Sequence, residues 1–304
     1  MAQQKFDQAI ELTESGAKLQ LRHGQVLCGA ELALLLVETF LKAEVKFSPE
    51  ALARIRDVFE CFPREQEETA AEWVILDRDS PETQGEPSNE RTEAEKAEAE
   101  RAAIAKSRVE GCSAFLKQAL KWSKLSGGPN MGAPEIHDML AEYVWTQSPS
   151  PSLSTVSRHF IWGSRPEAFA SALIDVMKAS HLHEADLVVT RGVLQYLAVG
   201  KLWDATQLLD EVRHRCCNNI QDDDAPWLPD SPLMHFNRFL LCALERKSLP
   251  LFSMLRKKYQ KSLSRDPSFE KYVDEVGTRF FNLRRPPMIP GMFGDLLKAI
   301  SGED

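Results

Sequence analysis

Histidine and cysteine side chains stand close together at two places in this chain of 304 residues, and both are metal-ligand types. His214 is followed by Cys216 and Cys217, but no second ligand pair occurs at zinc-finger spacing, and adjacent cysteines cannot easily both reach one tetrahedral ion. His181 and His183 are two residues apart, which places them on different sides of a helix. We therefore expect no bound metal ion.

A glycine-rich stretch at 127–132 has the glycines of a phosphate-binding loop. No Lys-Ser or Lys-Thr follows it and no buried strand precedes it, so a turn between helices explains it better. Neither Gly-x-Ser-x-Gly nor His-Glu-x-x-His occurs, and glutamate is too common here to single out a catalytic pair. The sequence thus predicts no catalytic residue and no cofactor, although an enzyme stays an open alternative.

Two glutamates could form a small acidic patch. Glu31 and Glu38 are seven residues apart, which is two helical turns, so both carboxylates project from the same side of a helix. Ordinary solvation of a surface helix explains such a pair. The alternative is a docking site for a basic partner, where complementary charge would chiefly raise the rate of encounter.

The net charge of −8 is concentrated in residues 64–101, which hold thirteen acids and five bases. The rest of the chain is balanced overall, so we expect no nucleic-acid partner. The apolar run at 32–37 is too short to span a bilayer. The first residues lack the features of a signal peptide, and the cysteines are too sparse for a secreted disulfide scaffold, which favours a cytosolic location.

Apolar residues recur at helical spacing along most of the chain, and Ser48-Pro49 and Asp266-Pro267 carry start signals of helices. Connections of a few residues make neighbouring helices antiparallel, and such pairs must stack to bury their apolar faces. We expect an all-α fold, an α-solenoid with a tetratricopeptide-like right-handed superhelix. The predicted helices cover 3–22, 31–45, 48–62, 104–123, 134–145, 152–162, 168–179, 185–199, 202–212, 232–244, 250–263, 267–281 and 290–300.

Two segments interrupt this pattern. Residues 64–103 are acidic and rich in Glu, Ala, Ser and Pro, which predicts an unstructured insertion, although 92–103 could propagate a solvated helix. The Asn-, Asp- and Pro-rich segment near 219–232 predicts an ordered loop or one small β-hairpin. The expected organisation is therefore N-terminal helical repeats at 1–63, the insertion at 64–103, and C-terminal helical repeats with a docking tail at 104–304.

Several short segments along the chain carry a resemblance to a known family. They are His23-Gly24-Gln25, Glu31-Leu32, Lys42-Ala43-Glu44-Val45, Ala119-Leu120-Lys121-Trp122-Ser123, Glu184-Ala185-Asp186-Leu187, Val193-Leu194-Gln195-Tyr196-Leu197, Arg265-Asp266-Pro267 and Phe280-Phe281. Together they resemble the Golgi to ER traffic protein 4 family, the adaptor in the guided entry of tail-anchored proteins. Their order and spacing match the family across nearly the whole chain, which no single motif could establish.

The resemblance implies a non-enzymatic cytosolic adaptor with only a peripheral relation to the ER membrane. Its N-terminal half would bind a targeting ATPase of the arsenical-pump type, and Glu31 and Glu38 fall on the family's ATPase-facing acidic positions. Its C-terminal half would bind a ubiquitin-like subunit, the fifth component of the pathway. There the segment around Trp227 and Leu228 resembles the family's docking hairpin, with a helix containing Phe236 and Phe239 as its floor.

Two departures from the family qualify these expectations. Family members carry a further helix pair ahead of the point that aligns with Met1, with basic residues that help grip the ATPase, so ATPase binding would be weakened where that pair is absent. The acidic insertion at 64–101 replaces a short connection. The alternative function is a generic tetratricopeptide-like scaffold of another complex, such as a proteasome-lid-type assembly.

Overall fold

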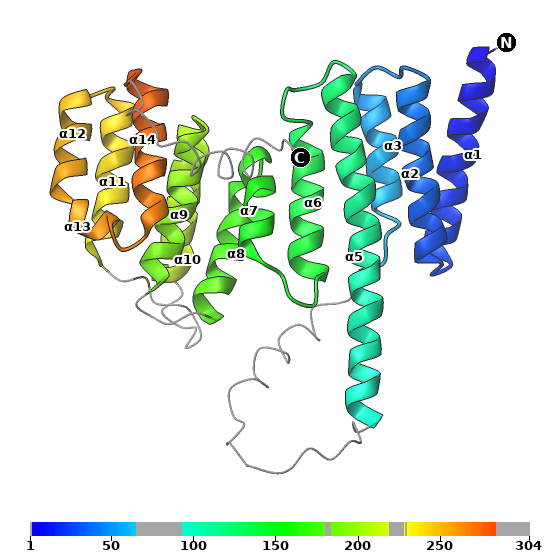
Figure 1. The fold of residues 1–304 in the computed structure, drawn as a ribbon, viewed down its shortest axis with the longest axis horizontal. Helices are drawn as coiled ribbons and strands as arrows, with labels where there is room; N and C mark the ends of the chain where they lie inside the picture. The colour runs from blue at the N-terminus through cyan, green and yellow to red at the C-terminus, as the bar shows by residue number, and fades with distance from the viewer. Residues whose placement is uncertain (1, 65–92, 180–183, 219–227, 229, 284–304) are drawn as a thin grey trace. The chain divides into compact units, whose positions relative to one another are not determined.

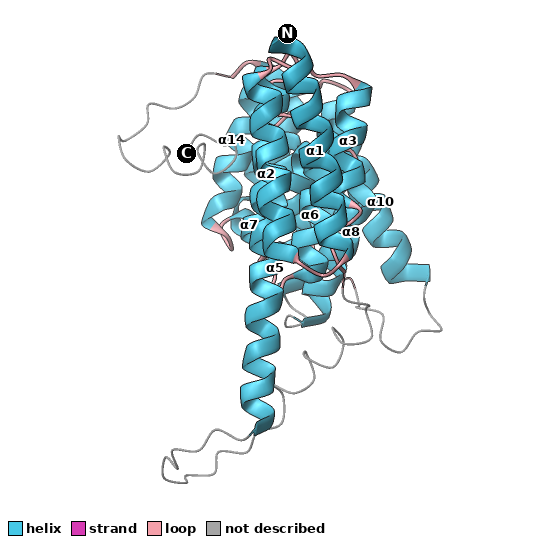
Figure 2. Ribbon diagram, turned by 90° about the vertical axis from the view of Figure 1, so that its right-hand side faces the viewer, coloured by secondary structure: helices cyan, strands magenta, loops and turns pink. Residues whose placement is uncertain are grey.

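The computed structural model of the chain describes residues 2–64, 93–179, 184–218, 228 and 230–283, and within these ranges it contains helices and no strands (Figures 1 and 2). The fold is thus all-α, an α-solenoid, as predicted. The helices are α1 (Ala2–Arg22), α2 (Val26–Lys42), α3 (Pro49–Phe59), α5 (Glu93–Leu125), α6 (Pro134–Gln147), α7 (Leu153–Trp162), α8 (Pro166–Ala179), α9 (Ala185–Ala198), α10 (Leu202–Asn218), α11 (Pro232–Glu245), α12 (Leu249–Lys258), α13 (Gln260–Leu263) and α14 (Pro267–Phe281).

The chain forms two compact units, residues 1–152 and 153–304. The first contains α1 to α6 and the second α7 to α14. The three-segment organisation expected from the sequence stays a prediction, because most of the acidic segment and the expected tail helix at 290–300 lie outside the described residues. The possible β-hairpin near 219–232 also falls largely outside them.

Helix starts follow local side-chain chemistry. The Ser48 hydroxyl accepts a hydrogen bond of 3.2 Å from the backbone N–H of Ala51, with Pro49 at the first helical position. Asp266 caps α14 in the same way, accepting a bond of 2.8 Å from the N–H of Ser268. Each cap satisfies a backbone donor that has no partner within its helix. These two predicted starts are confirmed.

In the first unit α2 is packed between α1 and α5, and α5 packs in turn on α6. The core of this unit contains Trp122, whose indole N–H donates a hydrogen bond of 2.9 Å to the carbonyl oxygen of Val45. The rings of Phe40 and Phe47 pack against the indole at centroid distances of 5.3 and 5.7 Å. Because Val45 and Phe47 lie in the connection from α2 to α3, one buried tryptophan fixes that connection to α5.

Gly29 lets α1 approach α2 closely. A Cβ atom at this position would lie 2.6 Å from Cγ of Leu21, far inside contact distance. The next residue, Ala30, is buried on the same helix. Small residues therefore keep one side of α2 tightly packed, and the large side chains of this helix that remain exposed project from its other side.

Helix α5 is 33 residues long and extends well beyond its neighbours in the first unit (Figure 2). Among its described side chains Ala105 is the first that is buried, and Lys96, Glu98 and Glu100 before it are exposed. The helix considered for residues 92–103 is thus present from Glu93 as the solvated start of α5 rather than as a separate element.

In the second unit α9 is central and packs on α8, α10, α11 and α14. Four polar contacts along α9 join it to its neighbours, and we call them the α9 polar set. Asp186 Oδ2 lies 2.7 Å from a guanidinium nitrogen of Arg265, Thr190 Oγ1 accepts a 2.9 Å bond from Asn237, Arg191 pairs with Asp266, and the Gln195 amide donates to the Tyr272 hydroxyl at 3.3 Å. These contacts tie α9 to α11, to α14 and to the residues just before α14.

Several helix boundaries differ from the sequence prediction. Helix α2, predicted at 31–45, begins five residues earlier at Val26 and ends at Lys42. Helix α10 continues to Asn218, six residues past the predicted end, and an ion pair of 2.6 Å between Arg215 and Glu211 supports this added stretch. The predicted helix 250–263 is divided at Tyr259 into α12 and α13. Neither Gly nor Pro marks that break, so the local sequence carries no signal for it.

Candidate functional site

The two predicted acidic residues of the first unit lie on the exposed side of α2. Glu31 and Glu38 are both exposed, and Leu27 and Leu35 are 64% and 43% exposed. In sequence order these four residues are separated by four, four and three positions, which places them along one side of the helix. We call Leu27, Glu31, Leu35 and Glu38 the α2 face.

Few internal contacts occupy the α2 face. Glu38 Oε2 lies 3.8 Å from Nζ of Lys42, an exposed pair of the kind that contributes little to stability. Glu31 has no ion-pair partner among the residues that the structure describes. Two leucines and two carboxylates thus remain available for a partner that combines apolar and basic groups.

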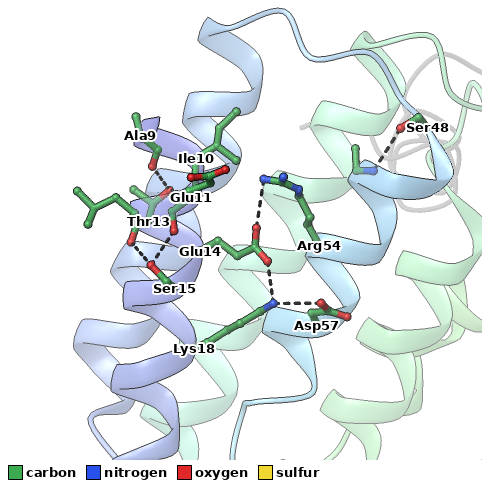
Figure 3. A network of polar contacts seen from close by, with 12 residues as sticks. Ala9, Ile10, Glu11, Thr13, Glu14, Ser15, Lys18, Ser48, Arg54 and Asp57 are labelled. Carbon is green, nitrogen blue, oxygen red and sulfur yellow. Dashed lines mark hydrogen bonds and ion pairs between the residues drawn. The ribbon is translucent and has the colours of Figure 1, made fainter. Parts of the chain in front are cut away.

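Helix α1 is held in place by a network of charges that the sequence did not reveal (Figure 3). Nζ of Lys18 lies 2.7 Å from Glu14 and 3.0 Å from Asp57, and Arg54 lies 3.3 Å from Glu14. Burial by itself would lower the pKa of Lys18, but its hydrogen bonds to Glu14 and Asp57 outweigh burial and raise that pKa. The network joins α1 to α3 and so helps to position α2, against which α1 packs.

Two of the docking residues predicted for the C-terminal half, Phe236 and Phe239, lie on α11, one buried and one exposed. Phe239 is 51% exposed, whereas Phe236 is 1% exposed and its ring packs 5.7 Å from the ring of Tyr259. Leu228 is half-buried, and Trp227 lies outside the described residues. Of the two phenylalanines, Phe239 is therefore exposed on α11, whereas Phe236 belongs to the core.

A polar contact neighbours Phe239. Nε2 of His235 lies 2.7 Å from Oδ1 of Asp230, and the imidazole ring lies 6.4 Å from the ring of Phe239. Ser231 caps α11 by accepting a hydrogen bond from the N–H of Met234. The residues leading into α11 are therefore fixed to the helix that carries Phe239.

Of the remaining candidates from the sequence, His181 and His183 lie outside the described residues. No group of three or more His, Cys, Asp or Glu side chains within the described part of the chain is arranged to hold a metal ion. Gly127 and Gly132 both have positive φ, in the turn between α5 and α6. None of the described helices is both long and apolar enough to cross a membrane.

Two exposed features were not predicted from the sequence: Leu27 with Leu35, and a cluster of basic residues at 246–265. The leucines recur with Glu31 at intervals of four, which is a helical signal. The basic cluster was missed because charge was counted over the whole chain outside the acidic segment, where acidic and basic residues are equal in number. A local count of charged residues would have found it.

Stacked antiparallel helix pairs of this kind define a helical-repeat protein. The model of the family "Golgi to ER traffic protein 4" matches residues 3–300. The chain belongs to this family.

Curated relatives agree with this assignment. The chain is 38% identical to "Protein GET4" of Arabidopsis thaliana, over 98% of this chain and 86% of the relative. It is 29% identical to a Golgi to ER traffic protein 4 homolog of Dictyostelium discoideum, over 99% and 80%, and 28% identical to the Homo sapiens homolog, over 99% and 78%. These relatives are named as traffic proteins and not as enzymes.

A solved structure shares the fold. The crystal structure titled "C. therm. Get4" aligns with a TM-score of 0.70 over 99% of this chain and 84% of that chain. At 20% sequence identity, this likeness supports the solenoid architecture alone.

Proposed function

We propose that the chain is a non-enzymatic cytosolic adaptor in the delivery of tail-anchored proteins to the ER, linking a targeting ATPase to a ubiquitin-like, chaperone-recruiting subunit. Family membership supports the pathway. The single observation that carries the adaptor role is the α2 face, where exposed leucines and carboxylates share one side of a helix that is packed on its other side. Such an adaptor works by raising the effective concentration of one partner near the other.

In this proposal the ATPase binds at the α2 face. Leu27 and Leu35 supply apolar contact, and Glu31 and Glu38 orient a basic surface of the ATPase. The double reversal E31K/E38K should lower the association rate at least tenfold, because complementary charge acts mainly on encounter. The association rate is measured with the chain immobilised on a sensor surface and the nucleotide-loaded ATPase dimer in solution, at two salt concentrations. Because salt screens charges, the difference in rate between E31K/E38K and the unmodified chain should be smaller at the higher salt concentration.

The control is E100K/E110K, which makes the same change in net charge at exposed residues of α5. It should bind the ATPase like the unmodified chain. Equal loss of binding in both variants would show a general charge effect and would remove the α2 face from the proposal.

The ubiquitin-like subunit would bind at Phe239, with Leu228 and the supporting core residue Phe236 as further members of the proposed site; Trp227, which the sequence also predicts here, lies outside the described residues. The substitution F239A should weaken this binding tenfold or more, because large aromatic side chains carry much of the free energy of protein interfaces. W203A removes another exposed aromatic residue of the same unit and serves as the matched control. The dissociation constant measured by calorimetry should rise tenfold or more in F239A and stay unchanged in W203A.

The adaptor role requires both partners on one chain. Mixing the chain with both proteins should give a ternary complex by size-exclusion chromatography with light scattering. E31K/E38K should leave only the binary complex with the ubiquitin-like subunit, and F239A only that with the ATPase. Mutually exclusive binding would contradict the adaptor role even if each binary complex forms.

A further inference from the structure

The segment 246–265 is strongly basic in a chain of net negative charge. It holds seven Lys or Arg residues and no Asp or Glu. It covers the turn after α11, the whole of α12 and α13, and the residues that precede α14. Such a local concentration of one charge sign is a surface property that the net charge of the chain conceals.

Five of these bases are exposed and have no carboxylate partner among the described residues: Arg246, Lys247, Lys257, Lys258 and Lys261. The other two are occupied, since Arg256 lies 2.5 Å from Asp274 and Arg265 pairs with Asp186. None of the five is therefore engaged in an ion pair among the described residues, although Nζ of Lys258 lies 5.6 Å from the centre of the Tyr259 ring.

Exposed apolar side chains lie among these bases. Leu249 and Leu251 are each 37% exposed and Met254 is 53% exposed, all on α12. The opposite side of this helical stretch is buried through Phe252, Leu255 and Tyr259, at intervals of three and four residues. Met254 and Lys257 lie three residues apart on the outer side of α12, and Lys261 is exposed on α13.

We propose that this surface, defined by Arg246, Lys247, Leu249, Leu251, Met254, Lys257, Lys258 and Lys261 and called the α12 face, binds anionic phospholipid bilayers. Clusters of four to eight basic residues on an amphipathic helix are attracted to anionic headgroups, and the apolar side chains between them can enter the boundary of the acyl chains.

The distribution of charge favours a bilayer over a single acidic peptide. Bases lie at both ends of α12, which is ten residues and so about 15 Å long, with the apolar residues between them. Four of the five bases are lysines, and lysine is a flexible point charge without the planar fork that reads a fixed carboxylate or phosphate. Mobile headgroups spread over a surface match this arrangement.

The inference goes beyond the proposed adaptor function and does not rest on it. It concerns α12 and α13, whereas the proposed ATPase site is on α2. A chain that fails to bind either protein partner could still bind vesicles, and the reverse also holds, so the two ideas fail separately.

The test is flotation of the full chain with vesicles of phosphatidylcholine containing about 30% phosphatidylserine, beside vesicles of phosphatidylcholine alone. We expect binding only to the anionic vesicles. K257E/K258E/K261E should reduce it by about a hundredfold, on the basis of roughly fivefold for each lysine. The charge-matched control K106E/K117E/K121E changes three exposed lysines of α5 and should bind normally.

A second variant tests the apolar contribution. The variant M254S/L251S should bind anionic vesicles more weakly, because it has lost apolar side chains. Its remaining binding should still decrease as salt is added, because all the basic residues are retained. Circular dichroism of each variant should show unchanged helix content, since all substituted side chains are exposed.

Four outcomes would overturn the proposal. They are equal binding to neutral vesicles, loss of binding in the α5 control to the same degree, displacement by glycerophosphoserine, which carries the headgroup without acyl chains, and tighter binding of single-stranded RNA than of anionic vesicles. The last result would assign the α12 face to nucleic acid instead.

Discussion

The α2 face and the α9 polar set contain the same kinds of charged side chains in opposite situations. On α9, Asp186 is buried and paired with Arg265, and Arg191 pairs with the buried Asp266. On α2, Glu31 and Glu38 are exposed, and only a long contact to Lys42 engages Glu38. Acids of the first kind hold helices together, and acids of the second kind remain available to other molecules.

The comparison predicts that charge removal around α9 affects stability and that charge removal on α2 affects binding. The largest effect on stability is expected for D186A, at about 3 kcal/mol, because Arg265 loses its partner and a cavity replaces a buried carboxylate. Urea unfolding followed by circular dichroism measures this. A loss below about 0.5 kcal/mol would show that Asp186 contributes no more than a surface residue.

Removal of Asp266 should cost about 2 kcal/mol in D266A, since the helix cap and the contact with Arg191 both disappear. Burial alone would raise the pKa of Asp266, but hydrogen bonds from Arg191 and Ser268 outweigh it and hold that pKa below its usual value.

The sign of the pH effect follows from this lowered pKa. The folded chain keeps Asp266 charged at a pH where the unfolded chain already binds a proton, so the stabilisation is full above the unfolded pKa of about 4 and is lost as pH falls through the folded pKa. Unfolding free energies measured between about pH 6 and pH 3 should therefore fall more steeply for the unmodified chain than for D266N. If the unfolding free energies of the two proteins changed with pH in the same way, Asp266 would not contribute to the pH dependence.

A smaller effect is expected in the network of Figure 3. Glu14 contacts both Lys18 and Arg54, and E14Q weakens both contacts while keeping the size of the side chain. Because these groups are partly exposed, we expect a loss of about 1 kcal/mol. Amide hydrogen exchange should become faster mainly in α1. An equal increase of the exchange rate throughout the first unit would argue against a local role of Glu14 in holding α1.

The smallest effect on stability is expected on the α2 face. E31Q/E38Q should change the unfolding free energy by less than about 0.5 kcal/mol, as for other exposed substitutions. The same variant should slow ATPase association in the assay described for E31K/E38K, though less than the reversal does. A stability loss comparable to that of D186A would end the distinction between the two regions.

Local signals explain which parts of the fold were predictable. Ser48 with Pro49 and Asp266 with Pro267 carry their capping chemistry in adjacent residues, and both helix starts are confirmed. The pairs of the α9 polar set join residues far apart in sequence, such as Asp186 and Arg265, which are 79 positions apart. No periodicity within one helix specifies such pairs, because they depend on how helices stack.

The candidate sites were predictable to a different degree. The spacing of Glu31 and Glu38 placed them on one side of a helix, as the structure also has them. Phe236 and Phe239 have similar sequence surroundings, yet one is buried and the other exposed. Two residues that are three positions apart on a helix point in directions about 60° apart around its axis. Because this angle is small, the exact way in which α11 packs decides which of the two rings is exposed.

The long α5 has a consequence for sequence change. A deleted residue rotates the part of the helix before the deletion by about 100° relative to the part after it. Before Ala105 the described side chains are exposed, apart from the half-buried Ala102, so a rotation there would mostly exchange one solvated side chain for another. A deletion between Val109 and Phe115 would instead put buried residues on its two sides out of register, so the start of α5 can change in length more easily than the part that enters the core.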